Sequence, residues 1–161
     1  MEKEVISNSS SLIFIAKLNI FHLTKNVFSK IIIPEVVIKE ILSKNSPENE
    51  LIQKEIDNKY ININKIANIK NFPLDEGEKT AISLCLKKKI GIFLSDDKKA
   101  RIYAKSWGIK VVGVLGILLS NFQEKKIDKK EFLKILDKLI QIGYYISPAL
   151  YSETIKKLDE N

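Results

Sequence analysis

The stretch IGIFLSDDKKARIYAKSWGIKVVGV, residues 90–114, decides the fold class. It begins as a short apolar run, passes through two aspartates into a helix-like segment, and returns to a β-branched run. A strand, a helix and a second strand in succession are typical of a parallel sheet, because parallel strands need a crossover connection. These residues therefore predict an α/β fold with an acidic turn at the carboxyl end of a strand.

The same alternation continues along the whole chain. Strands are predicted at residues 4–7, 30–34, 59–64, 90–95 and 109–114. Helices are predicted at residues 10–25 with a break near Leu18, 34–45, 48–57, 75–88 and 97–107, followed by helical segments at 115–125, 128–143 and 148–158. This order predicts a three-layer α/β/α fold with a central parallel sheet and additional C-terminal helices.

The composition is that of a soluble globular protein of one domain. Hydrophobic residues make up 45% and charged residues 29% of the 161 residues, which is ordinary for such a domain. The longest apolar runs fall short of the ~18 residues that a membrane span needs, so we expect a cytoplasmic protein with no membrane partner. The single cysteine, Cys85, lies in an apolar setting and is predicted to be a buried, reduced thiol.

The net charge of +7 and the pI near 9.3 leave two interpretations open. A basic protein is suited to a polyanionic partner such as nucleic acid. Lysines at a helix end, such as those at 87–89, are equally explained by the helix dipole or by a solvated face.

Two acidic motifs follow predicted strands or open predicted helices. Asp96 and Asp97 suit either a divalent cation or the N-terminus of the following helix. Asp75 and Glu78 have capping-box spacing, although Glu76 adds more negative charge to that turn than capping requires.

Glu40 falls on the margin of the buried side of its predicted helix, where a carboxylate is costly unless it is paired or reaches solvent. Together, Glu40, Glu78, Asp96 and Asp97 are candidates to meet at the carboxyl edge of the sheet, next to Asn8 at the end of the first strand. An all-oxygen cluster of this kind favours Mg²⁺ or Mn²⁺. The lone histidine, His22, is predicted to pack in the core instead.

Four blocks of the chain together resemble the PIN domain. They are SNSSSLIFIAKL (7–18), IIIPEVVIKEI (31–41), LDEGEKTAISLCLKKK (74–89) and IFLSDDKKARIYAKSWGIKVVGVLGILL (92–119). The resemblance implies one PIN-like domain over 1–161, with a core at 1–124 and a helical extension at 125–161. It also implies a Mg²⁺- or Mn²⁺-dependent ribonuclease, often the toxin of a VapC-like type II toxin–antitoxin pair. A small antitoxin would then be a partner, and many relatives are dimers.

The resemblance places the family's second, third and fourth acids at Glu40, Glu78 and Asp97, with Asp96 as an additional carboxylate. Ser10 matches a hydroxyl that follows the first acid by two positions, and the resemblance implies that it binds substrate. The first acid itself should stand at position 8, where this chain has Asn8. An amide oxygen can still bind a hard cation, but the lost charge predicts weaker metal binding and impaired hydrolysis. Natural decay and deliberate inactivation are both compatible with this asparagine.

The expected substrate is RNA, steered by basic residues at the start of the helix after the acidic turn, namely Lys98, Lys99 and Arg101. A non-catalytic PIN-like binding module is the alternative, because Asn8 lacks the charge of the first acid. A phosphatase or signalling receiver domain would need an aspartate on the first strand, and Asn8 does not supply one.

Overall fold

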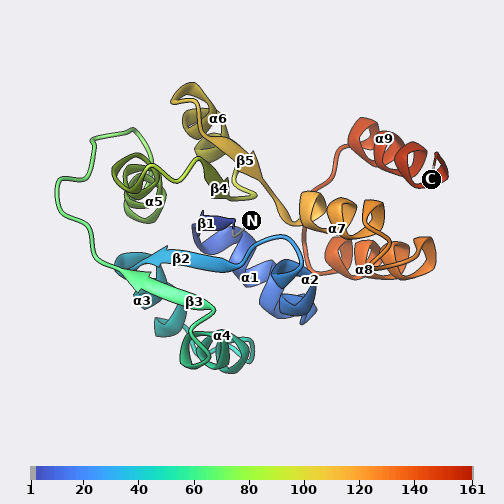
Figure 1. The fold of residues 1–161 in the computed structure, drawn as a ribbon, viewed down its shortest axis with the longest axis horizontal. Helices are drawn as coiled ribbons and strands as arrows, with labels where there is room; N and C mark the ends of the chain where they lie inside the picture. Colours follow the sequence, from blue (N-terminus) through green and yellow to red (C-terminus); the bar gives the residue numbers. More distant parts are fainter. Residues whose placement is uncertain (1–2, 161) are drawn as a thin grey trace.

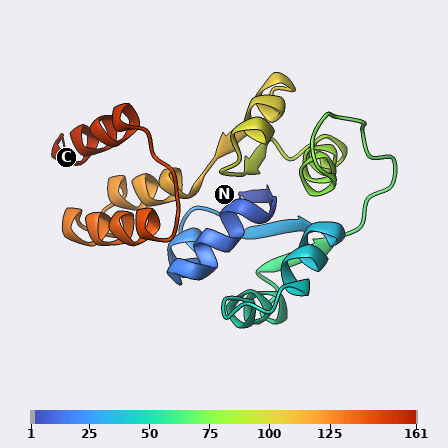
Figure 2. The same ribbon diagram turned by 180° about the vertical axis from the view of Figure 1, so that it is seen from behind.

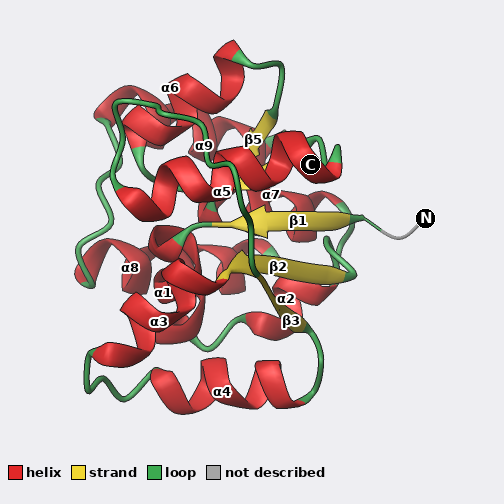
Figure 3. Cartoon of the chain, turned by 90° about the vertical axis from the view of Figure 1, so that its left-hand side faces the viewer, coloured by secondary structure: helices red, strands yellow, loops and turns green. Residues whose placement is uncertain are grey.

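Five parallel strands form the centre of the fold, as the alternation predicts. The computed structural model describes residues 3–160, so Met1, Glu2 and Asn161 lie outside the described part. The strands are β1 (Glu4–Ser7), β2 (Lys30–Pro34), β3 (Ile61–Asn64), β4 (Ile92–Leu94) and β5 (Lys110–Val112). Their order across the sheet is β3-β2-β1-β4-β5, and Figure 3 shows β1 and β2 side by side and pointing in the same direction.

The helices match the predicted ranges to within a few residues. They are α1 (Ser9–Leu18), α2 (Phe21–Lys25), α3 (Glu35–Ser43), α4 (Asn49–Asp57), α5 (Glu76–Lys88), α6 (Lys98–Ser106), α7 (Val114–Gln123), α8 (Lys129–Gln141) and α9 (Pro148–Asp159). The predicted break near Leu18 is confirmed, because Asn19 adopts a left-handed conformation (φ 53°) that ends α1.

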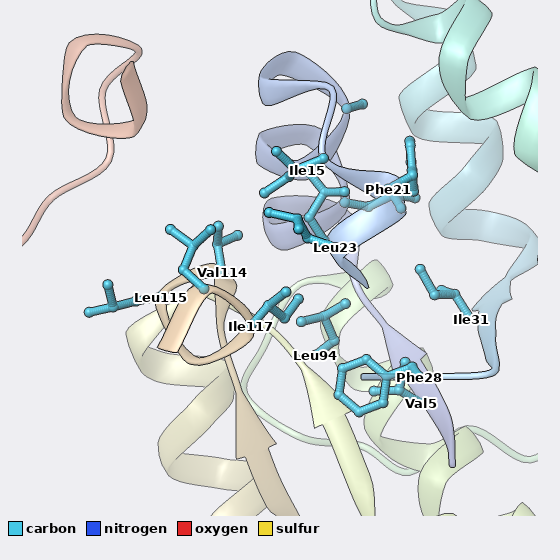
Figure 4. Close-up of a cluster of buried hydrophobic side chains, with 14 of the residues drawn as sticks. Val5, Ile15, Phe21, Leu23, Phe28, Ile31, Leu94, Val114, Leu115 and Ile117 are labelled. Atoms are coloured by element: carbon cyan, nitrogen blue, oxygen red, sulfur yellow. The ribbon is translucent and has the colours of Figure 1, made fainter. Parts of the chain in front are cut away.

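Alternating strand residues face two separate hydrophobic clusters, which is the expected consequence of the two-residue repeat of a strand. Val5 and Ile31 join a large cluster with residues of α1, α2, α3, α7 and α8, part of which is drawn in Figure 4. Ile6 and Ile32 join a smaller cluster with residues of α5 and α6. Helices therefore cover both faces of the sheet (Figures 1 and 2), and the predicted three-layer α/β/α architecture is confirmed.

The C-terminal helices are only partly packed into the core. The amphipathic spacing of α8 predicts a buried face of Phe132, Leu133, Leu136, Leu139 and Ile140. Phe132, Leu136 and Leu139 are buried and Leu133 is half-buried, whereas Ile140 is 38% exposed. In α9 the buried residues include Leu158, whereas Tyr145 in the preceding linker is 83% exposed. Figure 1 shows α9 beyond α7, away from the strands.

Two other predictions about single residues have opposite outcomes. Cys85 is buried, as predicted, and burial raises the pKa of its thiol to about 12. The prediction that His22 packs in the core is wrong, since its side chain is exposed. Its neighbours Phe21 and Leu23 turn inward, and successive side chains of a helix point in different directions.

The described residues include no helix that is both long and apolar enough to cross a membrane.

Candidate active site at the carboxyl edge of the sheet

The strand order creates a switch point beside β1. The chain proceeds from β1 to β2 and β3 on one side, and then returns to place β4 and β5 on the other side. Ser7 pairs with Leu94, so the residues that follow β1 and β4 emerge next to each other. Such a switch point at the carboxyl edge is where open α/β sheets usually bind ligands. Asn8 and the turn Ser95–Asp97 lie there.

Asn8 is built into this edge by its side chain. The residue is 2% exposed. Its amide nitrogen donates to Ser95 Oγ at 2.8 Å, and its amide oxygen accepts a hydrogen bond from Ser10 Oγ at 2.9 Å. Both ends of the amide are therefore held, which fixes the oxygen toward Ser10 and the nitrogen toward β4. Ser10, predicted to bind substrate, is used here for support and also accepts from the Asp96 backbone N–H at 3.1 Å.

Glu78 and Asp97 form a carboxylate pair beside this network. Asp97 is the N-cap of α6 and accepts from the Ala100 N–H at 2.8 Å. Burial, followed by the negative charges of Asp97 and Asp75 and a hydrogen bond with Asp97, raises the pKa of Glu78 to about 7. Two carboxylates that approach so closely cannot both ionise freely. The pair therefore holds negative charge that a proton or a cation would neutralise.

Asp75 and Glu78 also form the predicted capping box of α5. Asp75 accepts from the Glu78 backbone N–H at 2.9 Å, and the Asp75 backbone N–H donates to the Glu78 carboxylate, which lowers the pKa of Glu78. Capping and the contact with Asp97 thus occur in the same side chain. The capping prediction is therefore confirmed, and metal binding at this turn stays a prediction.

Glu40 is exposed, so its carboxylate reaches solvent, which is one of the two alternatives that its position predicts. A methyl group at Gly77 would be 3.7 Å from Glu40 Oε2 and 3.8 Å from Asp75 Oδ1, which places both carboxylates at the first turn of α5. Across residues 3–160, no three acidic, histidine or cysteine side chains approach closely enough to hold a metal ion together. Within the described residues, Glu40 therefore does not join Glu78 and Asp97 in one group of metal ligands.

Asp96 has a different environment from Asp97. Its Oδ2 accepts from Ser11 Oγ at 2.6 Å and from the Val114 N–H at 3.1 Å, and its Oδ1 accepts from Tyr144 Oη at 2.8 Å. These donors come from α1, α7 and the linker after α8. Because both oxygens are occupied, the geometry favours a structural role for Asp96 over the predicted metal ligation.

The predicted RNA-binding cations divide into two groups. Arg101 turns inward and donates through Nη1 to the Ser95 carbonyl at 2.8 Å, so it supports the acidic turn. Lys98 and Lys99 are exposed on the first turn of α6. Of these two lysines, Lys98 faces the cleft beside α6 and Lys99 is absent from its lining.

Three supporting residues were not predicted as part of the site. Ser11 lies in the polar run after β1, Ser95 directly precedes the aspartates, and Tyr144 lies 48 residues after its partner Asp96. A hydroxyl next to a strand end is a usable signal for the two serines. The sequence has no equivalent signal for the tyrosine, because its contact depends on the path of the C-terminal extension.

The substitution Tyr144→Phe should lower the free energy of unfolding by about 1 to 2 kcal/mol. It keeps the edge-to-face contact with Phe14 but removes a hydrogen bond to a carboxylate, and bonds to charged groups are among the stronger ones. Urea unfolding measures the change. Tyr145→Phe is the matched control, since Tyr145 is 83% exposed and should change stability by less than about 0.5 kcal/mol. Equal effects of the two variants would contradict the role of Tyr144.

Comparisons with known proteins agree with this architecture. A family model described as DUF3368, a PIN domain, matches residues 4–160, whereas no curated protein matches the chain. Among solved structures, a PilT N-terminus domain protein, SSO1118, from the hyperthermophilic archaeon Sulfolobus solfataricus P2 is similar, with a TM-score of 0.60 and 16% identity over 74% of this chain and 93% of that one. A domain of a functionally unknown protein from Methanocaldococcus jannaschii DSM 2661 has a TM-score of 0.47 and 14% identity over 70% and 91% of the chains. The chain belongs to the PIN-domain family, whose fold is generally that of metal-dependent nucleases.

Proposed function

We propose that this protein is a metal-dependent endoribonuclease, a hydrolase that cleaves phosphodiester bonds with Mg²⁺ or Mn²⁺. The observation that supports it is the Glu78–Asp97 pair at the switch point of a PIN-domain sheet. Burial, and after it the negative charge of Asp97, raise the pKa of Glu78 to about 7. A divalent cation would relieve this repulsion.

The donor set fits a hard cation that is held weakly. Glu78 and Asp97 would bind it, and the remaining positions would be filled by water, as is usual for Mg²⁺ in proteins. The Asn8 amide oxygen already accepts a hydrogen bond from Ser10. It keeps one further lone pair, with which it could contact the cation as an uncharged ligand. A site with two charged ligands should bind more weakly than one that includes a third carboxylate at position 8.

The chain's own residues would each have a defined task. When bound, the cation would supply charge stabilisation at the phosphoryl oxygen and lower the pKa of a water. Glu78 and Asp97, both deprotonated, would hold the cation and its bound waters beside the reacting phosphate. Ser10, Ser95 and Arg101 would hold the turn in place, and Lys98 would attract the RNA backbone.

RNA cleavage with and without EDTA tests this function. The protein should cleave single-stranded RNA slowly with Mn²⁺, the Asn8→Asp protein should cleave it faster, and cleavage by both should stop when EDTA is added. Asp97→Asn in the Asn8→Asp background keeps a residue that can cap α6 but removes a ligand charge, so the rate should fall by at least about 100-fold. Cleavage that persists in EDTA or in the Asp97→Asn protein would contradict the proposal.

A non-catalytic binding module is the second candidate, and Asn8 is the observation that favours it. The amide is buried and bonded at both ends, so this edge of the sheet is well ordered without a charge at position 8. Turnover that appears only in the Asn8→Asp protein would assign the present chain to this second class.

The stability of the cation-free protein should fall as the pH rises from about 5 to about 8. The folded protein binds the Glu78 proton more tightly than the unfolded chain, since the pKa of this group rises from 4.5 to about 7 on folding. The resulting stabilisation is complete below pH 4.5 and is lost as the pH passes through about 7. Thermal unfolding across this range measures it. Glu78→Gln should flatten the profile, and saturating Mn²⁺ should restore stability at the high-pH end. An unchanged profile in Glu78→Gln would contradict the shifted pKa.

We further propose that the protein is the toxin of a type II toxin–antitoxin pair, bound by a small cognate antitoxin, and that it forms a homodimer. The resemblance to VapC-like proteins supports this, as do exposed apolar side chains near the chain's end, including Ile140, Ile142 and Tyr151. Size-exclusion chromatography with light scattering, with and without the neighbouring gene product, tests both parts. A protein that stays monomeric and does not bind the neighbouring gene product would contradict both parts of this proposal.

A further inference from the structure

A cleft of about 1110 Å³ lies beside the acidic turn. One wall is the face of α6 with Lys98, Ile102 and Lys105, and the other includes Leu115 of α7 and Leu150 of α9. Figure 1 shows α6 and α9 on different sides of β5, the edge strand of the sheet. Asp96 and Arg101 also line the cleft, so it adjoins the turn that contains Asp97.

The lining of this cleft is strongly basic. Its cationic side chains are Lys3, Lys98, Arg101, Lys105 and Lys110, and Asp96 is its one carboxylate. Both oxygens of Asp96 are already hydrogen-bonded. Within residues 3–160, Lys98, Lys105 and Lys110 take part in no ion pair. The positive charge is therefore available to a polyanion.

Apolar and aromatic side chains accompany these lysines. Ile102 is 58% exposed and Tyr145, which also lines the cleft, is 83% exposed. An exposed tyrosine in a cleft that lysines also line suits unpaired bases that stack while their phosphates contact the cations. A duplex would keep its bases stacked inside and would leave these side chains uncovered.

We propose that this cleft binds the single strand of RNA on one side of the scissile phosphate, with Lys105 and Lys110 paired to its backbone and Tyr145 against a base. The proposal rests on the proposed ribonuclease function and specifies where its substrate lies. It replaces Lys99 with Lys105 and Lys110 as backbone contacts, because these two lysines line the cleft. A segment of an acidic partner protein is the competing occupant.

Fluorescence anisotropy in EDTA tests RNA binding separately from cleavage. The probe is a fluorescein-labelled single-stranded RNA of mixed sequence and about 12 nucleotides. The double variant Lys105→Glu, Lys110→Glu should weaken binding by at least about tenfold and should reduce the slope of log affinity against log salt by about 1.4. Tyr145→Ala, which keeps the charge, should weaken it about fivefold or more.

The matched control is Lys87→Glu, Lys88→Glu, which makes the same change in charge on exposed residues at the end of α5. It should alter affinity by less than about threefold, and circular dichroism melting should show that both double variants fold. An equal loss of RNA affinity in the two double variants would show that only the net charge of the protein matters, and it would overturn the proposal. Unchanged RNA affinity in the Lys105/Lys110 variant would also overturn it and would leave the cleft to an acidic protein segment. RNA bound in the cleft without cleavage by the Asn8→Asp protein would contradict the proposed function alone.

Discussion

Asn8→Asp should raise the affinity for Mn²⁺ by about 10- to 100-fold and should increase the rate of RNA hydrolysis. One added unit charge at about 4 Å from a cation is worth on the order of several kcal/mol at an effective dielectric of 20. Repulsion from Glu78 and Asp97 offsets part of it. The new carboxylate also finds suitable neighbours, since the Ser10 hydroxyl already donates at this position and the Ser95 hydroxyl, which now accepts from Asn8, can rotate to donate.

Calorimetric titration with Mn²⁺ measures this gain. Asn64→Asp is the matched control because Asn64 ends β3 at the same edge of the sheet, two strands away from β1. It adds the same charge without reaching the Glu78–Asp97 pair, so its Mn²⁺ affinity should stay within about threefold of the unmodified protein. An equal gain in both variants, or none in Asn8→Asp, would show that position 8 is not part of a cation site.

Gly113→Ala should destabilise the protein by about 3 to 5 kcal/mol and lower its melting temperature by about 10 °C or more. Gly113 has an extended backbone (φ −114°, ψ −176°) that any residue can adopt, so the reason is space alone. A methyl group there would overlap Asp96 Oδ1 and would lie 2.9 Å from Arg101 Nη1. Asp96 would have to move away from its three donors, Ser11, Val114 and Tyr144. These groups would then lose their hydrogen-bond partner inside the protein.

Gly91→Ala provides the matched control, since nothing lies within 4 Å of a methyl group at Gly91. Its free energy of unfolding should change by less than about 1 kcal/mol. Chemical denaturation of both variants compares them directly. If Gly113→Ala were as stable as Gly91→Ala, Asp96 could not be the point at which α1, α7 and the C-terminal linker are joined.

Much of the fold was predictable because local patterns and the sheet agree. The strand runs are short and β-branched, the caps at Asp75, Asp97 and Asp128 mark helix starts, and the amphipathic spacing of α8 indicates its buried side. The position of the site was predictable for a similar reason. Strand ends in a parallel sheet share one edge, so Asn8 and Asp97 had to lie near each other.

The remaining features depend on contacts between distant segments. Asp96 and Asp97 are adjacent and chemically identical, yet Asp96 is surrounded by donors from three elements whereas Asp97 faces Glu78. Spacing alone does not distinguish them. Glu40 is a second example. Its spacing in the helix does not show that the carboxylate reaches solvent beside the first turn of α5.

Anomalous diffraction from crystals of the Asn8→Asp protein grown with Mn²⁺ tests the central claim most directly. The account predicts one strong peak about 2.1 Å from carboxylate oxygens of Glu78 and Asp97, with Asp96 still bonded to Ser11 and Tyr144. A Mn²⁺ ion bound by Asp96 in place of Glu78, or the absence of a peak at the carboxyl ends of β1 and β4, would contradict the account.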